Sequence, residues 1–221
     1  IRAATTAATA LATGRRCFPV PSLDAAAVVA AQLRDPLLVG EQRGRMPAGF
    51  HLNNSPAALV GRADVERPMV LLSSSGTKLM ATARTASAAY VGCFRNAAFL
   101  ATHLAGRHPR VAVLGAGSKG EFREEDQICC AWIAAGLLAA GYKAADSRTR
   151  EIVARWYDAP AEACVEGKSA AFLRRSGQLA DLEFVLGHVN DLAAACAIVG
   201  PEVVLSRPEE PHPAHSVAPG A

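Results

Sequence analysis

The chain has 221 residues, of which 51% are hydrophobic and 5% aromatic, and its formal net charge is only +3. This length suits one α/β domain with a substantial core, and the scattered Lys and Arg residues do not form the basic surface of a nucleic-acid-binding protein. The longest apolar run, 128–142, is too short and too rich in Ala and Gly to cross a bilayer, and no signal peptide is visible, so we expect a cytoplasmic protein with no membrane contact.

Short apolar runs, which are typical of buried strands, alternate with helix-like segments along the chain. The expected strands are 17–20, 37–40, 69–73, 89–92, 111–115 and 203–205. The expected helices are 24–33, 78–84, 97–106 and 124–140. Alternation of this kind predicts right-handed crossovers, and therefore an α/β fold with a mainly parallel sheet and helices on both faces.

The remaining segments define the expected domain limits. Residues 144–197 have a helical pattern that is broken at Pro160 and Gly177, and the proline-rich polar segment 207–221 is expected to be disordered. The chain begins with IRAATTAATA, as if within an element, so we expect that a segment upstream of it is missing. We therefore predict a single domain over 1–206 that is followed by a disordered tail.

The six cysteines are expected to be reduced packing residues. They form no C-x-x-C pair and no metal-binding spacing with histidine, and several lie within apolar runs. They are Cys17, Cys93, Cys129, Cys130, Cys164 and Cys196. The thiol of Cys93 and the hydroxyl of Ser74 are candidate nucleophiles, although neither has an obvious neighbouring base.

Small, hydroxyl, amide or basic residues follow the expected strands, at the edge where parallel sheets bind their ligands. The segment Ser73-Ser74-Ser75-Gly76-Thr77 precedes a helix, so its hydroxyl and N–H groups form either an oxyanion cradle or an ordinary N-cap. Arg43 and Arg45 are either a clamp for a phosphate or sulfonate or solvated surface arginines. Asn54 and Asn96 either donate to a ligand or satisfy turn backbone.

The stretch VAVLGAGSKGEFREED, residues 111–126, resembles a dinucleotide fingerprint, because a strand-like run enters Gly115-x-Gly117-x-x-Gly120. The next helix, however, begins with Glu124-Glu125-Asp126, and acidic residues in a first turn would repel a pyrophosphate. Either the helix dipole explains these acids, or a divalent cation bridges them to a phosphate while Lys119 neutralises the remaining anionic charge.

Adjacent residues on a helix point about 100° apart, so Glu125 and Asp126 cannot both face one cleft squarely. One of them is therefore expected to be a ligand or an acid/base group, and the other a structural partner. The spacing alone does not decide which residue has which role.

Several short motifs occur in an order and spacing that together are specific. They are IRAATT at 1–6, GEQRG at 40–44, GFHLNNSP at 49–56, SSSGT at 73–77, GCFRNA at 92–97 and AGSKGEFREED at 116–126. In the same order they resemble LRATT, GERGG, GFDLGNSP, TTNGT, GSFLNA and AGTxGxFSxED of the 2-phosphosulfolactate phosphatases, the magnesium-dependent phosphatases of coenzyme M biosynthesis. The similarity extends from residue 1 to about 206, and Ser176-Gly177 and the segment 186–191 also fit.

The resemblance implies an α/β fold, a Mg²⁺ cofactor and hydrolysis of a phosphomonoester on a small acid, with 2-phospho-3-sulfolactate as the family's substrate. It implies that Asp126 and Glu41 bind the metal or transfer protons, and Glu125 is the alternative residue for the same role. His51 is a candidate general acid because it lies in a ligand-binding loop. The residues implied to bind the phosphate and the other anionic groups are Arg2, Arg43, Asn54, Ser73, Ser74, Ser75, Gly76, Thr77, Asn96, Gly117, Ser118, Lys119 and Gly120. A homodimer is the simplest assembly to expect.

The sequence departs from the family pattern at His51, Asn53 and Ser75, where the family has Asp, Gly and Asn. The resemblance implies an N-terminal strand, with an aspartate just before LRATT, that would lie upstream of this chain. Replacing an acid by His51 lowers the negative charge of the site. A second interpretation is therefore a non-catalytic protein that binds an anion or a metabolite. A third interpretation is a nucleotide-binding oxidoreductase that uses the glycines at 115–120. Attack by water and attack by a carboxylate remain equally open.

Overall fold

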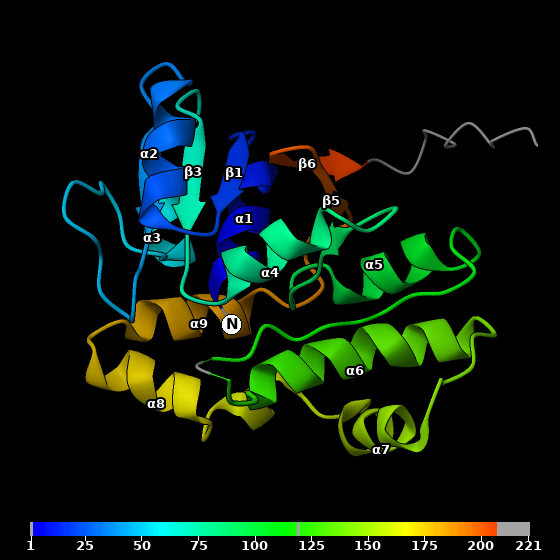
Figure 1. Ribbon diagram of the computed structural model, residues 1–221. Helices are drawn as coiled ribbons and strands as arrows, with labels where there is room; N and C mark the ends of the chain where they lie inside the picture. The colour runs from blue at the N-terminus through cyan, green and yellow to red at the C-terminus, as the bar shows by residue number, and fades with distance from the viewer. Residues whose placement is uncertain (1, 119, 207–221) are drawn as a thin grey trace, which may run out of the picture.

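The computed structural model describes residues 2–118 and 120–206 of the chain (Figure 1). The strands are β1 (Cys17–Val20), β2 (Leu37–Gly40), β3 (Met69–Leu72), β4 (Tyr90–Val91), β5 (Ala195–Val199) and β6 (Glu202–Ser206). The helices are α1 (Arg2–Ala12), α2 (Leu23–Ala31), α3 (Pro56–Val60), α4 (Gly76–Ala83), α5 (Ala97–Leu104), α6 (Glu124–Ala139), α7 (Ser147–Trp156), the 3-10 helix η1 (Ala161–Cys164), α8 (Lys168–Arg175) and α9 (Leu179–Gly187). Lys119, which we expected to bind an anion, lies outside the described residues. The tail 207–221, which we expected to be disordered, also lies outside them.

The six strands form one mixed sheet in the order β2-β3-β1-β6-β5-β4. The pairs β1–β3 and β2–β3 are parallel, whereas β1–β6, β5–β6 and β4–β5 are antiparallel. The prediction of an α/β fold is therefore confirmed, but the prediction of a mainly parallel sheet is wrong. The reason is the C-terminal hairpin β5–β6, which turns at Gly200 with a positive φ of 55° and adds antiparallel pairs.

The expectation of helix throughout 144–197 is also wrong, because β5 begins at Ala195. Its sequence, ACAIV, is a short apolar run, and periodicity does not distinguish such a run in a strand from one in a helix. The segment 111–115 differs from its prediction in the opposite way, since it is not assigned as a strand. It passes between α5 and α6 in Figure 1 as an extended loop.

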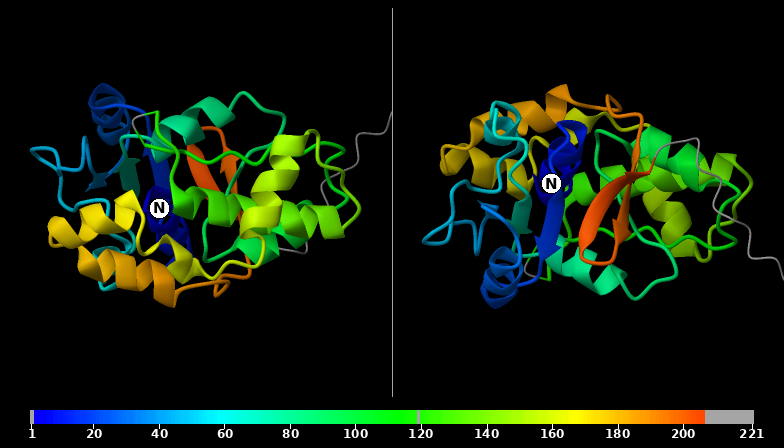
Figure 2. Two further views of the ribbon diagram at one scale, coloured as in Figure 1. Left: turned by 90° about the horizontal axis from the view of Figure 1, so that it is seen from below. Right: turned by 90° about the horizontal axis from the view of Figure 1, so that it is seen from above.

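The core of the sheet follows from the alternation of side chains along β3. Met69 and Leu71 pack with the buried alanines of α1, whereas Val70 and Leu72 pack with Ala26 of α2. Helix α1 is built almost wholly of Ala and Thr, so its backbone can approach the strands closely. Figure 2 shows α1 running through the centre of the molecule. In the part of the chain that the structure describes, no helix is both long enough and apolar enough to cross a membrane.

One buried arginine holds the start of β1 to the loop before β3. Arg15 is 1% exposed, and its Nη2 lies 2.9 Å from Oδ1 of Asp64. The Asp64 carboxylate also accepts hydrogen bonds from Arg62 and Arg67. The hydrogen bond from Arg62, together with the attraction of Arg15, outweighs partial burial and lowers the pKa of Asp64 well below its ordinary value.

We expect Asp64→Asn to lower the free energy of unfolding by about 2–3 kcal/mol at pH 7, because Arg15 loses its charged partner. The folded-state pKa lies below that of the unfolded chain, so this stabilisation is complete above about pH 5 and is lost as the pH falls through the folded pKa. Urea unfolding of both proteins between pH 3 and pH 7 measures the difference. The matched control is Asp35→Asn, since Asp35 is 73% exposed; an equal loss in the two variants would contradict the prediction.

Candidate active site

The loops that follow the strands enclose a cavity of about 910 Å³ together with the first turn of α1, the segment 110–118 and the start of α6. Most of the expected site residues line this one cavity. They are Arg2, Glu41, Arg43, Asn54, Ser73, Ser74, Ser75, Gly76, Gly117, Ser118, Glu125 and Asp126. Five separate stretches of the sequence thus converge, as expected for the ligand-binding edge of an α/β sheet.

Glu41 ties together the loops that follow β2 and β3. Its Oε1 accepts the backbone N–H of Ser74 at 2.7 Å, and its Oε2 accepts the Ser74 hydroxyl at 2.8 Å and the Gly44 N–H at 2.7 Å. The residue is only 8% exposed, so these charge-assisted bonds form in a poorly solvated place. The carboxylate that we expected to bind a metal or to transfer a proton therefore positions the walls of the cavity.

The segment 73–77 caps its own helix. Ser73 Oγ accepts the N–H of Gly76 at 3.0 Å, and Thr77 Oγ1 donates to the Ser73 carbonyl at 3.0 Å and accepts the Ser73 N–H at 2.9 Å. Thr77 is fully buried and does not line the cavity. The hydroxyls of Ser73 and Thr77 thus satisfy backbone groups around the start of α4, whose N-cap residue is Ser75. Ser75 and Gly76 remain at the cavity wall.

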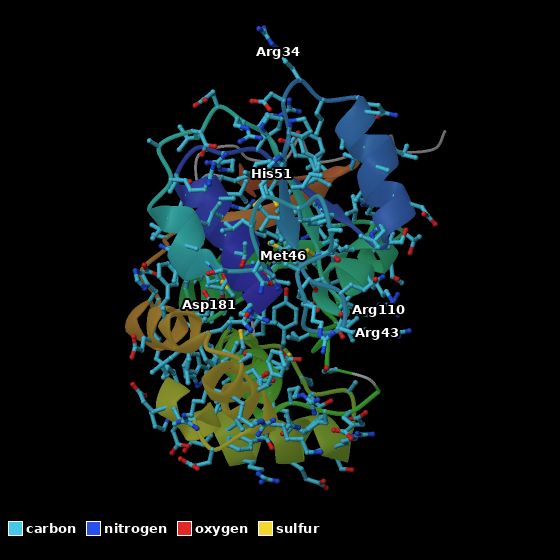
Figure 3. All side chains as sticks on the ribbon, turned by 90° about the vertical axis from the view of Figure 1, so that its left-hand side faces the viewer. Arg34, Arg43, Met46, His51, Arg110 and Asp181 are labelled. Atoms are coloured by element: carbon cyan, nitrogen blue, oxygen red, sulfur yellow. The ribbon has the colours of Figure 1, made fainter. Side chains whose placement is uncertain are left out.

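Arg43 has a strained backbone at the mouth of the cavity. Its φ is +55°, which costs a residue other than glycine about 1–2 kcal/mol, and its N–H donates to Ser74 Oγ at 2.7 Å. Arg43 lines the cavity, as do Arg110 and Arg175. None of these three exposed arginines forms an ion pair within the described ranges. Figure 3 shows Arg43 and Arg110 on the same flank of the molecule.

Arg2 and Asn54 belong to a buried polar network. Nη1 of Arg2 lies 3.2 Å from Oδ2 of Asp181, whose other oxygen accepts the Ser55 hydroxyl at 2.5 Å. Asn54 Oδ1 accepts the Thr6 hydroxyl at 2.8 Å. The charge of Arg2 is thus already balanced by Asp181, whereas the amide nitrogen of Asn54 is available to a ligand in the cavity.

Asp126 lies beside the glycine loop. Its Oδ2 accepts the N–H of Gly117 at 2.7 Å, and a Cβ on Gly115 would lie 3.1 Å from the Cβ of Asp126. Gly117 has a φ of +58°, and a side chain there would meet the Glu121 carbonyl at 2.6 Å. The glycines therefore allow the loop to approach α6, and the Gly117 N–H binds a carboxylate of the protein itself, where a dinucleotide fingerprint would offer it to a pyrophosphate.

Two predicted site residues lie away from the cavity. Nδ1 of the exposed His51 accepts the Leu38 N–H at 2.9 Å and so satisfies the backbone of β2, an outer strand of the sheet. Asn96 is fully buried, accepting the Cys93 N–H at 2.9 Å and donating to the Val91 carbonyl at 3.1 Å. We therefore remove both from the candidate site. Figure 3 shows His51 well apart from Arg43. Gly120 does not line the cavity either.

The expected metal ligands do not form a complete site by themselves. Over 2–118 and 120–206, no group of three or more His, Cys, Asp or Glu side chains could hold a metal ion. Glu41 already accepts three hydrogen bonds, so the trio of Asp126, Glu41 and Glu125 is not a ligand set here. Mg²⁺ commonly uses only one or two protein carboxylates together with phosphate oxygens and water, and Asp126 is the carboxylate at the cavity that fits such a role best.

Two cysteine thiols that line the cavity are poor nucleophiles. Burial raises the pKa of Cys93 to about 11 and that of Cys130 to about 12, so both remain protonated at neutral pH. We expect Cys93→Ala to retain phosphate-releasing activity within about threefold, because a protonated buried thiol does not attack phosphorus. Initial rates of the two proteins test this, and a loss of more than about a hundredfold in a variant with an unchanged Tm would contradict it.

Several cationic residues line the cavity although no sequence pattern indicated a role for them. Arg110 precedes an expected strand and so stands at the end opposite to the ligand edge, and Arg175 lies on α8, far away in sequence. Lys168 and Arg123 also line the cavity, but both pair with Glu121, at 2.8 and 3.0 Å. Of these positions, Arg123 lies within the quoted motif 116–126, and Arg175 is next to Ser176-Gly177.

The fold and the cavity define an α/β protein whose strand-end loops enclose a cavity lined by three exposed arginines. The family model of 2-phosphosulpholactate phosphatase matches residues 1–192, and the chain therefore belongs to that family. A protein of Symbiobacterium thermophilum is 30% identical over 195 residues, which cover 87% of this chain and 77% of that protein. Proteins of Thermus thermophilus and Deinococcus radiodurans are 34% identical over 191 residues and 32% over 189, in each case 83% of this chain and 79% of the relative. All three carry the name "Probable 2-phosphosulfolactate phosphatase".

Proposed function

We propose that the protein is a phosphoric monoester hydrolase that releases phosphate from a small acid, with 2-phospho-3-sulfolactate as its substrate. Membership of the family and the names of the relatives support the reaction class. The observation that carries the substrate class is the set of three arginines around one cavity, Arg43, Arg110 and Arg175, which form no ion pair with any residue of the described ranges. A ligand with a phosphate and two further acidic groups would balance that charge.

In this proposal the arginines bind and orient the anionic groups, and the amide of Asn54 donates a neutral hydrogen bond. The reaction forms a bond between water oxygen and phosphorus, breaks the ester P–O bond and returns a proton to the leaving alkoxide. Asp126 is the carboxylate best placed to orient the water or to accept its proton, since it lines the cavity and is held by the Gly117 N–H. Stabilising charge on the transferring oxygens is the dominant demand of this chemistry.

A magnesium requirement is part of the proposal, with Asp126 as its protein ligand. The ion would supply positive charge to the phosphate oxygens. We also keep two earlier predictions. One is that the reaction serves coenzyme M biosynthesis, and the other is that the protein forms a homodimer.

Phosphate release from 2-phospho-3-sulfolactate, phospholactate and p-nitrophenyl phosphate, each with Mg²⁺ and with EDTA, tests the proposal. We expect release that depends on Mg²⁺ and is fastest with the sulfonated substrate. The departure at Ser75, which lines the cavity, favours a second candidate, a non-catalytic binder of the same acids. Saturable binding of 2-phospho-3-sulfolactate by calorimetry without any phosphate release would establish the binder and exclude the enzyme.

A further inference from the structure

A single carboxylate outside the candidate site pairs with two of the cations that line its cavity. Oε2 of Glu121 accepts a hydrogen bond from Nζ of Lys168 at 2.8 Å and another from Nη1 of Arg123 at 3.0 Å. Lys168 and Arg123 both line the cavity, whereas Glu121 does not. Two cations that donate to one oxygen offer what an acidic group of a ligand needs. The carboxylate of Glu121 therefore occupies a cationic position at the wall of the cavity.

The fold holds this cationic position together from separate parts of the chain. Arg123 is the N-cap of α6, and Lys168 is the first residue of α8. The two helix starts are in contact, because a Cβ on Gly167 would lie 2.9 Å from Oε2 of Glu124. Glu121 belongs to a tight turn that two backbone hydrogen bonds close. The packing of the two helices therefore sets the distance between the two cations.

The exposure of the three side chains indicates that Glu121 can be displaced. The side chains of Lys168 and Glu121 are 69% and 54% exposed, and an exposed ion pair contributes little to stability. The side chain of Arg123 is only 11% exposed, and a poorly solvated charge needs an anion beside it. The hydrogen bonds from Lys168 and Arg123 lower the pKa of Glu121 to about 2, so Glu121 supplies that anion at neutral pH. An acidic group of a ligand would meet the same need.

We propose that Arg123 and Lys168 bind one further acidic group of the ligand, a sulfonate or a carboxylate, and that Glu121 occupies this position until the ligand displaces it. Both kinds of group offer the oxygen acceptors that Glu121 supplies. Arg123 stands three residues before Asp126, so the position adjoins the carboxylate proposed to act at the phosphate. The inference rests on the proposed function for its ligand class, a small phosphorylated acid. Glu121 lowers the affinity for such acids and favours those with an acidic group that can replace it.

Three variants test this inference: Glu121→Gln, Lys168→Gln and, as the matched control, Glu166→Gln. Glu166 is exposed, stands two residues from Lys168 and makes no ion pair among the described residues. Its replacement therefore removes the same charge without releasing a cation of the cavity. Calorimetric titration in EDTA measures the Kd of 2-phospho-3-sulfolactate, phospholactate and phenyl phosphate, which differ in their further acidic groups. Phosphate release with Mg²⁺ and the Tm are measured separately.

We expect Glu121→Gln to lower the Kd of 2-phospho-3-sulfolactate about three- to fivefold and to leave that of phenyl phosphate within about twofold, at an unchanged Tm. The reason is that only the first of these ligands has a further acidic group for the released cations. Lys168→Gln should raise the Kd of 2-phospho-3-sulfolactate about threefold, and Glu166→Gln should leave it within about twofold. An equal gain with phospholactate would assign the position to the carboxylate, and a gain with the sulfonated ligand alone would assign it to the sulfonate.

An unchanged or higher Kd of 2-phospho-3-sulfolactate in Glu121→Gln would overturn the inference, and so would an unchanged Kd in Lys168→Gln. An equal gain in Glu166→Gln, or with phenyl phosphate, would overturn it too, since either result would indicate only a more positive protein. Binding that follows our expectations without any phosphate release would refute the proposed hydrolase and leave this inference standing. The absence of binding in every protein would refute both.

Discussion

Replacing Glu41 by glutamine is expected to lower the free energy of unfolding by about 2–3 kcal/mol and the Tm by about 5–10 °C. The carboxylate accepts three hydrogen bonds from donors of the two strand-end loops. A glutamine has one oxygen, so at least one buried N–H or O–H would face an amide NH₂ group. Ser74 also accepts the backbone N–H of Arg43, so a shift of Ser74 would displace Arg43 from its position at the cavity. We therefore expect phosphate release to fall by at least about tenfold.

The control for this prediction is Glu66→Gln, which changes an exposed glutamate that makes no ion pair in the described part of the chain. Differential scanning calorimetry and initial rates, measured on both variants and the parent protein, are sufficient. If Glu41→Gln has the stability and activity of Glu66→Gln, Glu41 does not hold the loops together.

Replacing Asp126 by asparagine is expected to reduce phosphate release by about 10²–10⁴-fold while the protein stays folded. Asparagine keeps an oxygen that can accept the Gly117 N–H, so the loop retains its contact with α6. The carboxylate charge, which the proposed mechanism needs for the water or for Mg²⁺, is lost. Single-turnover rates with 2-phospho-3-sulfolactate and a thermal melt separate the chemical effect from a structural one.

Asp158→Asn is the matched control, because Asp158 is an exposed aspartate after α7 and lies away from the cavity. Activity of Asp126→Asn within about threefold of the parent would rule out a direct role for this carboxylate. The mechanism would then need another acid.

The sequence predicted which residues line the cavity better than it predicted the hydrogen bonds that they make. Strands β1 and β2 have the predicted bounds, and the loops after β2 and β3 meet at one cavity. Composition at strand ends is a local property, so it could be recognised without a structure. Whether Ser73 caps a helix or faces a ligand depends on which donors lie within 3 Å, and that depends on the fold.

The failures have a common physical cause, which is long-range contact. His51 stands in a motif loop, but its ring bonds the backbone of β2, and Asn96 is enclosed by β4 and its neighbours. Arg110 and Arg175 reach the cavity from segments 65 residues apart. The alanine-rich run of β5 is a strand only because β4 and β6 flank it.

The central claim is that the arginines around the cavity select a phosphorylated acid, and the ratio of kcat/KM for 2-phospho-3-sulfolactate to that for p-nitrophenyl phosphate tests it most directly. We predict that Arg43→Gln lowers this ratio about tenfold, because one charged hydrogen bond to the substrate's second acidic group is lost and the phosphate contacts remain. Arg45→Gln, two residues away and outside the cavity lining, should leave the ratio unchanged. An unchanged ratio in Arg43→Gln, or an equal fall in both variants, would contradict the account.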